Sequence, residues 1–268
     1  LRKDGQDVQG IYERNDIQIR SKEGLEQYKG YYKNKNLPTK TIINENGLLL
    51  NVDVENGQKT GYFLDQKSNR YLLRKIAHGK RVVDCFSHTG GFALNAAMGN
   101  AKHVVSVDVS KTALDQGYQN AKLNHLEEKI DFVQADVFDY LDELKENEFD
   151  IIVLDPPAFT KSRNTINAAI RGYKEINLRG LKMVKPGGYF ATCSCSHYMN
   201  EEQLKKTVLE AAHDFVIIIT GYSKSEVILH NFFCGANLSV RCSFSDVYQE
   251  FLYILSLCNI SDQFIRIR

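Results

Sequence analysis

The chain has 268 residues, of which 34 are basic and 33 acidic, and a formal net charge of +1. This length allows one large or two modest domains, and the balanced charge excludes a chain-wide polyelectrolyte surface, so nucleic-acid binding would have to come from local patches. Six unevenly spread cysteines and no signal-like start lead us to expect a soluble, cytoplasmic protein. The apolar runs near the end are too short to span a membrane, so we expect no membrane partner.

The first 56 residues are rich in Lys, Asn, Glu and Gly and carry short alternating runs. These runs predict strands at 10–12, 17–20, 41–43 and 48–54, in a small β-rich module that precedes the main sheet. Because the chain begins at Leu1 in mid-pattern, we expect that a preceding domain has been removed.

Residues 61–81 predict a helix that leads into the first strand of the main sheet. Gln66 and Arg70 lie four residues apart and could share one face of this helix. Arg70 would then be placed to meet the carboxylate of a ligand. A solvated helix face is the alternative interpretation of the same two residues.

Residues 81–108 predict a strand, a glycine turn over Gly90 and Gly91, an Ala-rich helix and a second strand that ends in Asp108. In an open parallel sheet such a turn lies where ligands bind, and an acid ending the second strand can take two ribose hydroxyls. The turn lacks the glycine spacing that a pyrophosphate needs. It therefore suits a ligand with adenosine but no phosphate, such as S-adenosylmethionine; an ordinary turn beside an unrelated ligand is the alternative.

Further α/β alternation follows, with a helix at 110–124 and strands at 130–133 and 149–154. Asp136, after the first of these strands, could accept the adenine amino group or simply cap the helix at 138–144. The second strand runs directly into Asp155-Pro156-Pro157. Two prolines stiffen this exit, so we expect Asp155 to be held at the carboxyl edge of the sheet beside the ligand.

A basic segment at 159–185 carries seven basic residues and one acid, Glu175. It could guide a phosphate backbone toward the site or form a solvated helix face. The helix is predicted to close at 185–188, followed by a strand at 189–196 and a helix at 201–213. The basic residues are Lys161, Arg163, Arg171, Lys174, Arg179, Lys182 and Lys185.

Cys193, Cys195 and His197 would share one face of the strand at 189–196. A metal site is disfavoured because no fourth ligand with suitable spacing is evident. Buried structural cysteines are a second interpretation, and a nucleophile at Cys195 is the third. A thiolate that adds to carbon 6 of cytosine makes carbon 5 able to take a methyl group, and Asp155 could hydrogen-bond or protonate nitrogen 3 of the ring.

Several separated motifs resemble, in order, the bacterial 23S ribosomal RNA cytosine-5 methyltransferases that use S-adenosylmethionine. The resemblance covers about residues 10–214 and rests on GIYERNDIQIRSKEG, KTGYFLDQKSNR, DCFSHTGGFALNAAMGNAKHVVSVDVS, FDIIVLDPPAF, RGYKEIN and SCS. It implies that Cys195 is the nucleophile, whereas Cys193 is not required. The implied donor site consists of Gln66, Arg70, Phe86, Ser87, Gly90, Asp108, Asp136 and Asp155.

The resemblance also implies an α/β fold, a Rossmann-like seven-stranded methyltransferase sheet with helices on both faces. We expect the β-rich module at 1–56 and the methyltransferase domain at 57–268. The implied substrate is 23S ribosomal RNA, naked or in an assembling large subunit, with homodimerisation left open. The family usually carries an N-terminal domain of the pseudouridine-synthase-and-archaeosine-transglycosylase (PUA) type, and we expect the preceding domain that has been removed to be of this type.

Guanine-modifying ribosomal RNA methyltransferases resemble this chain too but lack the Ser-Cys-Ser strand end, so Cys195 favours cytosine. Methylation of a guanine nitrogen and a non-catalytic RNA-binding factor are the alternatives. Residues 215–268 depart from the family pattern. We expect either a frameshifted or otherwise altered tail or genuine divergence; if this tail supplies no final strand, the sheet would keep an open edge.

Overall fold

The computed structural model describes residues 9–34, 36–160, 162–196 and 198–214, together with the strand backbones at 218–223, 226–230 and 263–266. The chain divides into two compact units, Leu1–Lys67 and Ser68–Arg268. None of the helices in the described part of the chain combines the length and apolar character needed to cross a membrane.

The first unit contains two antiparallel hairpins. β1 (Tyr12–Asn15) pairs with β2 (Tyr28–Tyr31), and β3 (Lys40–Glu45) pairs with β4 (Leu48–Asp53). The predicted strand at 17–20 is wrong, because a short helix, α1 (Gln18–Lys22), occupies most of it. A run of four residues is too short for alternation to separate the two structures.

The second unit is built on a six-stranded sheet in the order β12-β9-β8-β5-β6-β7. Five of its strands are parallel, as predicted for this α/β chain. The sequence predicts seven strands, so the seventh stays a prediction. The parallel strands are β5 (Arg81–Cys85), β6 (His103–Asp108), β7 (Ile130–Gln134), β8 (Phe149–Leu154) and β9 (Val184–Thr192).

Strand β12 (Gln263–Arg266) pairs antiparallel with β9 along Tyr189–Thr192. The tail therefore supplies a strand next to β9. The open edge that we considered there does not occur, because β12 covers β9. Two further strands of the tail, β10 (Ile218–Ser223) and β11 (Glu226–His230), form a separate hairpin.

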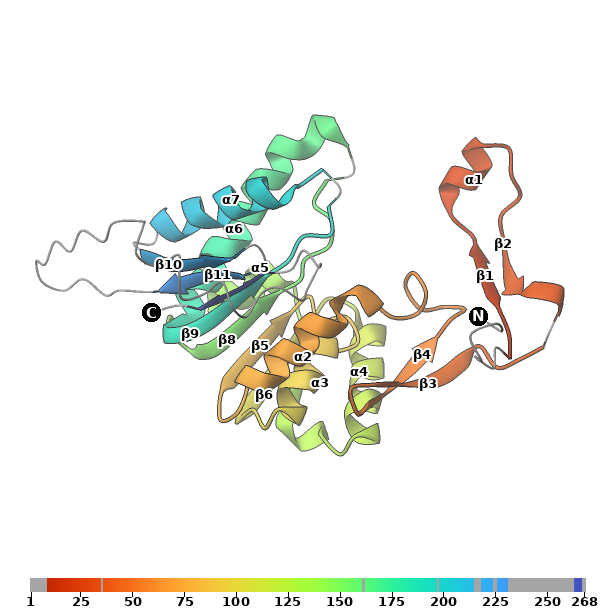
Figure 1. Cartoon of the computed structure of the whole chain (residues 1–268), viewed down its shortest axis with the longest axis horizontal. Helices are drawn as coiled ribbons and strands as arrows, with labels where there is room; N and C mark the ends of the chain where they lie inside the picture. Colours follow the sequence, from red (N-terminus) through yellow and green to blue (C-terminus); the bar gives the residue numbers. More distant parts are fainter. Residues whose placement is uncertain are drawn as a thin grey trace, which may run out of the picture. The chain divides into compact units, whose positions relative to one another are not determined.

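Helices cover both faces of the sheet (Figure 1). One face carries α5 (Val137–Glu143), α6 (Ile166–Met183) and α7 (Glu201–Asp214), which enclose the main apolar core with Val83, Ile152 and Phe190. The other face carries α2 (Lys67–Ile76), α3 (Gly91–Met98) and α4 (Lys111–Leu123). Capping fixes several of these helices; Ser110, for example, accepts a hydrogen bond from the Ala113 N–H and begins α4.

Candidate functional site

The order of the strands determines where a ligand would bind. From β5 the chain continues to β6 and β7 on one side and then crosses to β8 and β9 on the other. In open α/β sheets, ligands bind outside the carboxyl ends of the strands at such a reversal. Asp108 is the last residue of β6, and the segments that follow β5, β8 and β9 contain Ser87, Asp155 and Cys195 respectively, so the fold brings four predicted site regions to one edge.

The turn after β5 is a tight loop with three residues in the left-handed region. Phe86, His88 and Gly90 have φ values of 61°, 50° and 73°. The Ser87 N–H donates to the Val107 carbonyl at 3.0 Å, and the Gly90 N–H donates to the Ser87 carbonyl at 2.8 Å. Only the glycine adopts such a φ without steric cost, so the two other residues carry backbone strain at the predicted ligand turn.

Asp108 holds this turn from the neighbouring strand. One carboxylate oxygen accepts the His88 N–H and the other accepts the Ser110 N–H, both at 2.8 Å. Each oxygen still has capacity for another hydrogen bond, so the carboxylate can also accept two ribose hydroxyls. Burial lowers the pKa of His88, although the negative charge of Asp108 opposes this shift.

Asp84 is a site candidate that the sequence analysis did not single out. It lies in β5 with no exposed surface, and one of its oxygens accepts the Ala93 N–H of α3 at 2.9 Å. Burial is the main cause that raises its pKa to about 8, and the charges of Asp155 and Asp108 raise it further, whereas Arg70 opposes the shift. An acid inside an apolar run was the available signal.

Gln66 and Arg70 are both buried, with exposed fractions of 8% and 3%. The solvated helix face that we considered for them is therefore wrong. Arg70 belongs to the second unit and acts electrostatically on Asp84, whereas Gln66 lies at the end of the first unit.

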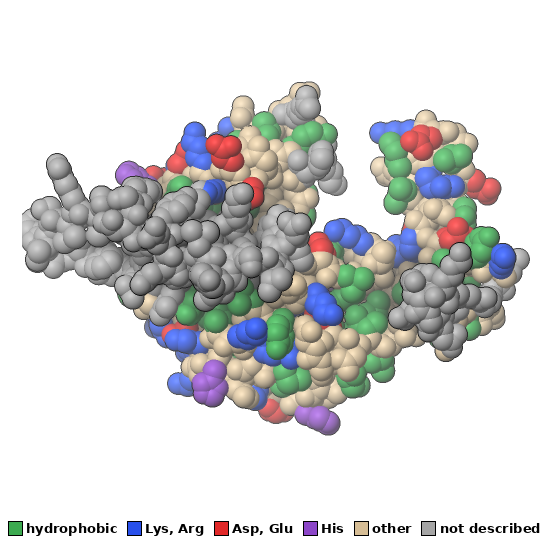
Figure 2. Space-filling model, viewed as in Figure 1, with side chains coloured by type: hydrophobic (Ala, Val, Ile, Leu, Met, Phe, Trp, Pro, Cys, Tyr) green, Lys and Arg blue, Asp and Glu red, His purple; other side chains and the backbone are tan. Residues whose placement is uncertain are grey.

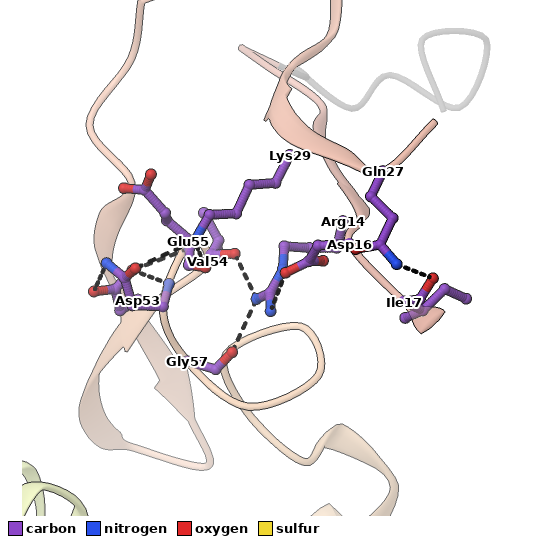
Figure 3. A network of polar contacts seen from close by, with 10 residues as sticks. Arg14, Asp16, Ile17, Gln27, Lys29, Asp53, Val54, Glu55 and Gly57 are labelled. Atoms are coloured by element: carbon purple, nitrogen blue, oxygen red, sulfur yellow. Dashed lines mark hydrogen bonds and ion pairs between the residues drawn. The ribbon is translucent and has the colours of Figure 1, made fainter. Parts of the chain in front are cut away.

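The loop that leads toward Gln66 is fixed by Arg14 of β1. Figure 3 shows the Arg14 guanidinium donating to the carbonyl oxygens of Val54 and Gly57, at 3.1 and 2.9 Å. Asp53 closes the same loop, since one carboxylate oxygen accepts two successive backbone N–H groups at 3.0 and 2.9 Å. Sequence reasoning missed Arg14, because its two acceptors lie more than 35 residues away from it.

Asp136 caps α5. Its exposed carboxylate accepts the Phe138 N–H at 2.8 Å, which is the structural alternative that we considered for this residue. The cap leaves lone pairs free on the carboxylate, so a contact with an adenine amino group stays a prediction.

Two contacts fix the segments that carry Asp155 and Cys195 at the carboxyl edge of the sheet. The Asp155 N–H donates to the Cys85 carbonyl at 3.3 Å, which fixes the exit of β8 against β5. Cys195 is exposed, and its Sγ lies 3.7 Å from the Pro156 carbonyl oxygen. The thiol therefore lies beside the residue that follows Asp155, at the carboxyl edge.

The predicted strand at 189–196 is shifted, because β9 ends at Thr192. Cys193 and Cys195 consequently do not share a strand face: Cys193 is buried and Cys195 is exposed. His197, the third member of the metal alternative, lies outside the described residues. Within the part of the chain that the structure describes, no three His, Cys, Asp or Glu side chains are grouped to hold a metal ion.

Three residues of the basic segment, Lys174, Arg179 and Lys185, form ion pairs in the part of the chain that the structure describes. Lys174 pairs with Asp214 at 2.8 Å, and Arg179 pairs with Asp142 at 2.6 Å and with Glu175 at 2.8 Å. On the face drawn in Figure 2, basic and acidic side chains lie side by side over this part of the second unit. A paired helix surface accounts for these residues; the side chains of Lys161 and Arg163 lie outside the described residues, and guidance of RNA stays a prediction.

The strand order and the polar carboxyl edge define a Rossmann-like α/β protein with a nucleoside-type site. A sequence model of the S-adenosylmethionine-dependent methyltransferases matches residues 25–218, and the chain belongs to this family. S-adenosylmethionine is therefore its cofactor.

Two proteins called ribosomal RNA large subunit methyltransferase I are among its relatives. The one from Aliivibrio fischeri (strain ATCC 700601 / ES114) is 44% identical and the one from Aeromonas salmonicida (strain A449) 45% identical, each over 207 residues. These matches cover 76% of this chain and 52% of each relative. The chain thus spans about half the length of the curated relatives it matches.

Solved structures agree with the family. The methyltransferase SMU.776, complexed with SAH, is 30% identical with a TM-score of 0.60, over 68% of this chain and 49% of that one. A SAM-dependent methyltransferase from Streptococcus mutans is 29% identical with a TM-score of 0.63, over 72% of this chain and 51% of that one.

The residues at the edge fit this cofactor. Ser87 Oγ and Asp84 Oδ1 are buried and have no hydrogen-bond partner among the described residues. Buried polar atoms of this kind call for a partner, and the polar groups of an adenosyl and methionyl ligand could supply one. The left-handed Gly90 and the remaining hydrogen-bonding capacity of Asp108 add to them. These residues together fit the polar groups of the cofactor.

Proposed function

We propose that the chain transfers a methyl group from S-adenosylmethionine to carbon 5 of a cytosine in large-subunit ribosomal RNA, with Cys195 as nucleophile. The observation that carries the proposal is the exposed thiol beside the Pro156 carbonyl, directly after Asp155. The names of the relatives at 44 and 45% identity support ribosomal RNA as the substrate.

We regard residues 1–56 as an N-terminal module and residues 57–268 as a methyltransferase domain that contains the proposed cofactor site. Asp108 would bind the ribose and Asp136 the adenine amino group, with the turn at Phe86, Ser87 and Gly90 around the adenosyl moiety. The remaining cofactor-binding residues of the proposal are Gln66, Arg70 and Asp155.

The chemistry follows from the low nucleophilicity of carbon 5. The Cys195 thiolate adds to carbon 6 and forms a C–S bond, and the electron pair of the former 5,6 double bond becomes available at carbon 5. Asp155 hydrogen-bonds or protonates nitrogen 3 and offsets the charge on the ring. When bound, S-adenosylmethionine supplies the electrophilic methyl group. Loss of the carbon 5 proton to a base and cleavage of the C–S bond then restore the double bond and the thiolate.

The test is to incubate the chain with labelled S-adenosylmethionine and unmodified 23S RNA, beside Cys195→Ala, and to identify the labelled nucleoside. Cys193→Ala is the matched control, since that cysteine is buried two residues away. We expect 5-methylcytosine that is lost only in Cys195→Ala. Label on guanine that survives Cys195→Ala would favour a guanine-nitrogen methyltransferase, and failure to bind S-adenosylmethionine would favour a non-catalytic RNA-binding factor.

Cytoplasmic localisation and homodimerisation are further parts of the proposal. A ribosomal RNA substrate supports the first, because the RNA is assembled into subunits in the bacterial cytoplasm. Sedimentation velocity tests the second: a single species at the 30.5 kDa mass of the chain would contradict a dimer.

A further inference from the structure

Cys195 lies between two serines that are both hydrogen-bonded to other elements. Ser194 Oγ donates to the phenol oxygen of Tyr173 in α6, at 2.9 Å. Ser196 Oγ donates to the Thr160 carbonyl at 3.3 Å, and the Ser196 N–H donates to Ser194 Oγ at 3.3 Å. The serines thus connect the segment that carries the thiol to α6 and to the loop after Asp155.

These side-chain bonds matter because the strand ladder has ended. β9 stops at Thr192, and the Cys193 N–H, which donates to the Leu154 carbonyl at 2.8 Å, is the last backbone link to β8 that precedes Cys195 in the described chain. Without a ladder, the conformation of a backbone segment depends on local side-chain bonds.

Tyr173 is a rigid partner for this purpose. Its side chain is fully buried, and its ring lies 4.6 Å from the Phe159 ring, measured between centroids. Burial raises the pKa of Tyr173, so the phenol stays neutral and keeps its hydrogen bond at physiological pH. A locked side chain of this kind can hold a functional segment in one geometry.

We propose that Tyr173 is a positioning residue for the nucleophile: through Ser194 it holds the segment after β9 so that the Cys195 thiol lies beside the Pro156 carbonyl. The inference rests on the proposed function and adds a residue that acts through the hydrogen bond rather than by touching the RNA.

Tyr173→Phe removes only the phenol oxygen and keeps the ring that packs on Phe159. We expect kcat for methyl transfer to fall about tenfold, with KM for both substrates within about twofold, because a displaced thiol impairs the reaction more than binding. Ser194→Ala should have the same effect, and Ser194→Thr, which keeps the hydroxyl, should restore activity. The double variant should be no worse than Ser194→Ala alone, since Ser194→Ala already removes the hydrogen bond to Tyr173.

The matched control is Tyr140→Phe, because Tyr140 is a partly buried tyrosine in a different helix, α5, and its variant should keep wild-type kcat. If Tyr173→Phe fails to fold, as judged by circular dichroism, Ser194→Ala carries the test alone. Additive losses in the double variant, or kcat within about twofold of wild type in both single variants, would overturn the proposal.

A second readout separates this inference from the proposed function. Alkylation of Cys195 by iodoacetamide is followed at the peptide level by mass spectrometry, without RNA or cofactor. We expect the rate at pH 8 to rise at least about threefold in Tyr173→Phe, because a thiol that is no longer held beside the Pro156 carbonyl is more accessible to the reagent. An unchanged rate counts against Tyr173, whereas a wild-type chain that transfers no methyl group counts against the function alone.

Discussion

Asp84 gives the most quantitative prediction from this structure. Its carboxyl group is buried in β5 and has a pKa of about 8, chiefly because burial disfavours the charged form. In the unfolded chain an aspartate has a pKa of about 3.9. Between these two values the folded chain keeps a proton that the unfolded chain has lost, so the contribution of Asp84 to stability is greatest below about pH 4 and falls as the pH rises toward 8.

The size of the effect follows from linkage. Each pH unit between the two pKa values costs about 1.4 kcal/mol, so the group lowers the free energy of unfolding by about 3 kcal/mol from pH 5 to pH 7 and by at most about 6 kcal/mol over the whole interval. Asp84→Asn has no such titration, and the asparagine oxygen can still accept the Ala93 N–H. The variant should therefore gain stability relative to wild type as the pH rises.

The assay is urea unfolding from pH 5 to pH 8, followed by circular dichroism and by tyrosine fluorescence, since the chain has 14 tyrosines and no tryptophan. Asp115→Asn is the control, because Asp115 forms an exposed pair with Lys111 and should contribute little at any pH. A difference between Asp84→Asn and wild type that does not change from pH 5 to pH 8 would refute the reasoning.

Three other variants test individual contacts within the two units. Asp108→Ala removes the acceptor of two loop N–H groups and the proposed ribose contact, so S-adenosylmethionine should bind at least about tenfold more weakly by calorimetry; equal affinity, as expected for Asp115→Ala, would contradict this role. Gly117→Ala places a methyl group 2.8 Å from an aromatic ring and should cost about 1–3 kcal/mol in urea unfolding; wild-type stability would show that α4 can shift. Arg14→Ala removes two bonds to loop carbonyls and should speed hydrogen exchange at 54–57; unchanged protection would mean that the loop holds without it.

Periodicity and turn residues predicted the second unit well. The apolar runs flanking the Gly90 turn became β5 and β6, and the run before Asp155 became β8 with the predicted ends. The start of β9 was wrong, because Pro186 and the two glycines after it were interpreted as the end of a helix. The structure tolerates them in a strand because the pairing of β9 with β8 skips from Val184 to Tyr189, so a missing N–H costs no ladder bond there.

The position of a candidate site residue was predictable where the residue ends a strand or directly follows one, as Asp108 and Asp155 do. It was not predictable where the contact joins distant segments. Ser194 and Tyr173 lie 21 residues apart on different elements, and only the packing of α6 against the sheet brings their hydroxyls together. Periodicity says which face of an element is buried but not which polar atoms meet there.

The acids at the carboxyl edge explain why one of them can remain in the core. Asp84, Asp108 and Asp155 are close enough for the two others to raise the pKa of the first, and Arg70 offsets only part of this repulsion. Burial and these neighbouring charges raise the pKa of Asp84 to about 8, so the carboxyl group that water does not reach holds its proton at neutral pH. The edge thus presents carboxyl oxygens of Asp108 and Asp155 where the proposed ribose and base contacts need acceptors, without a buried charge at Asp84.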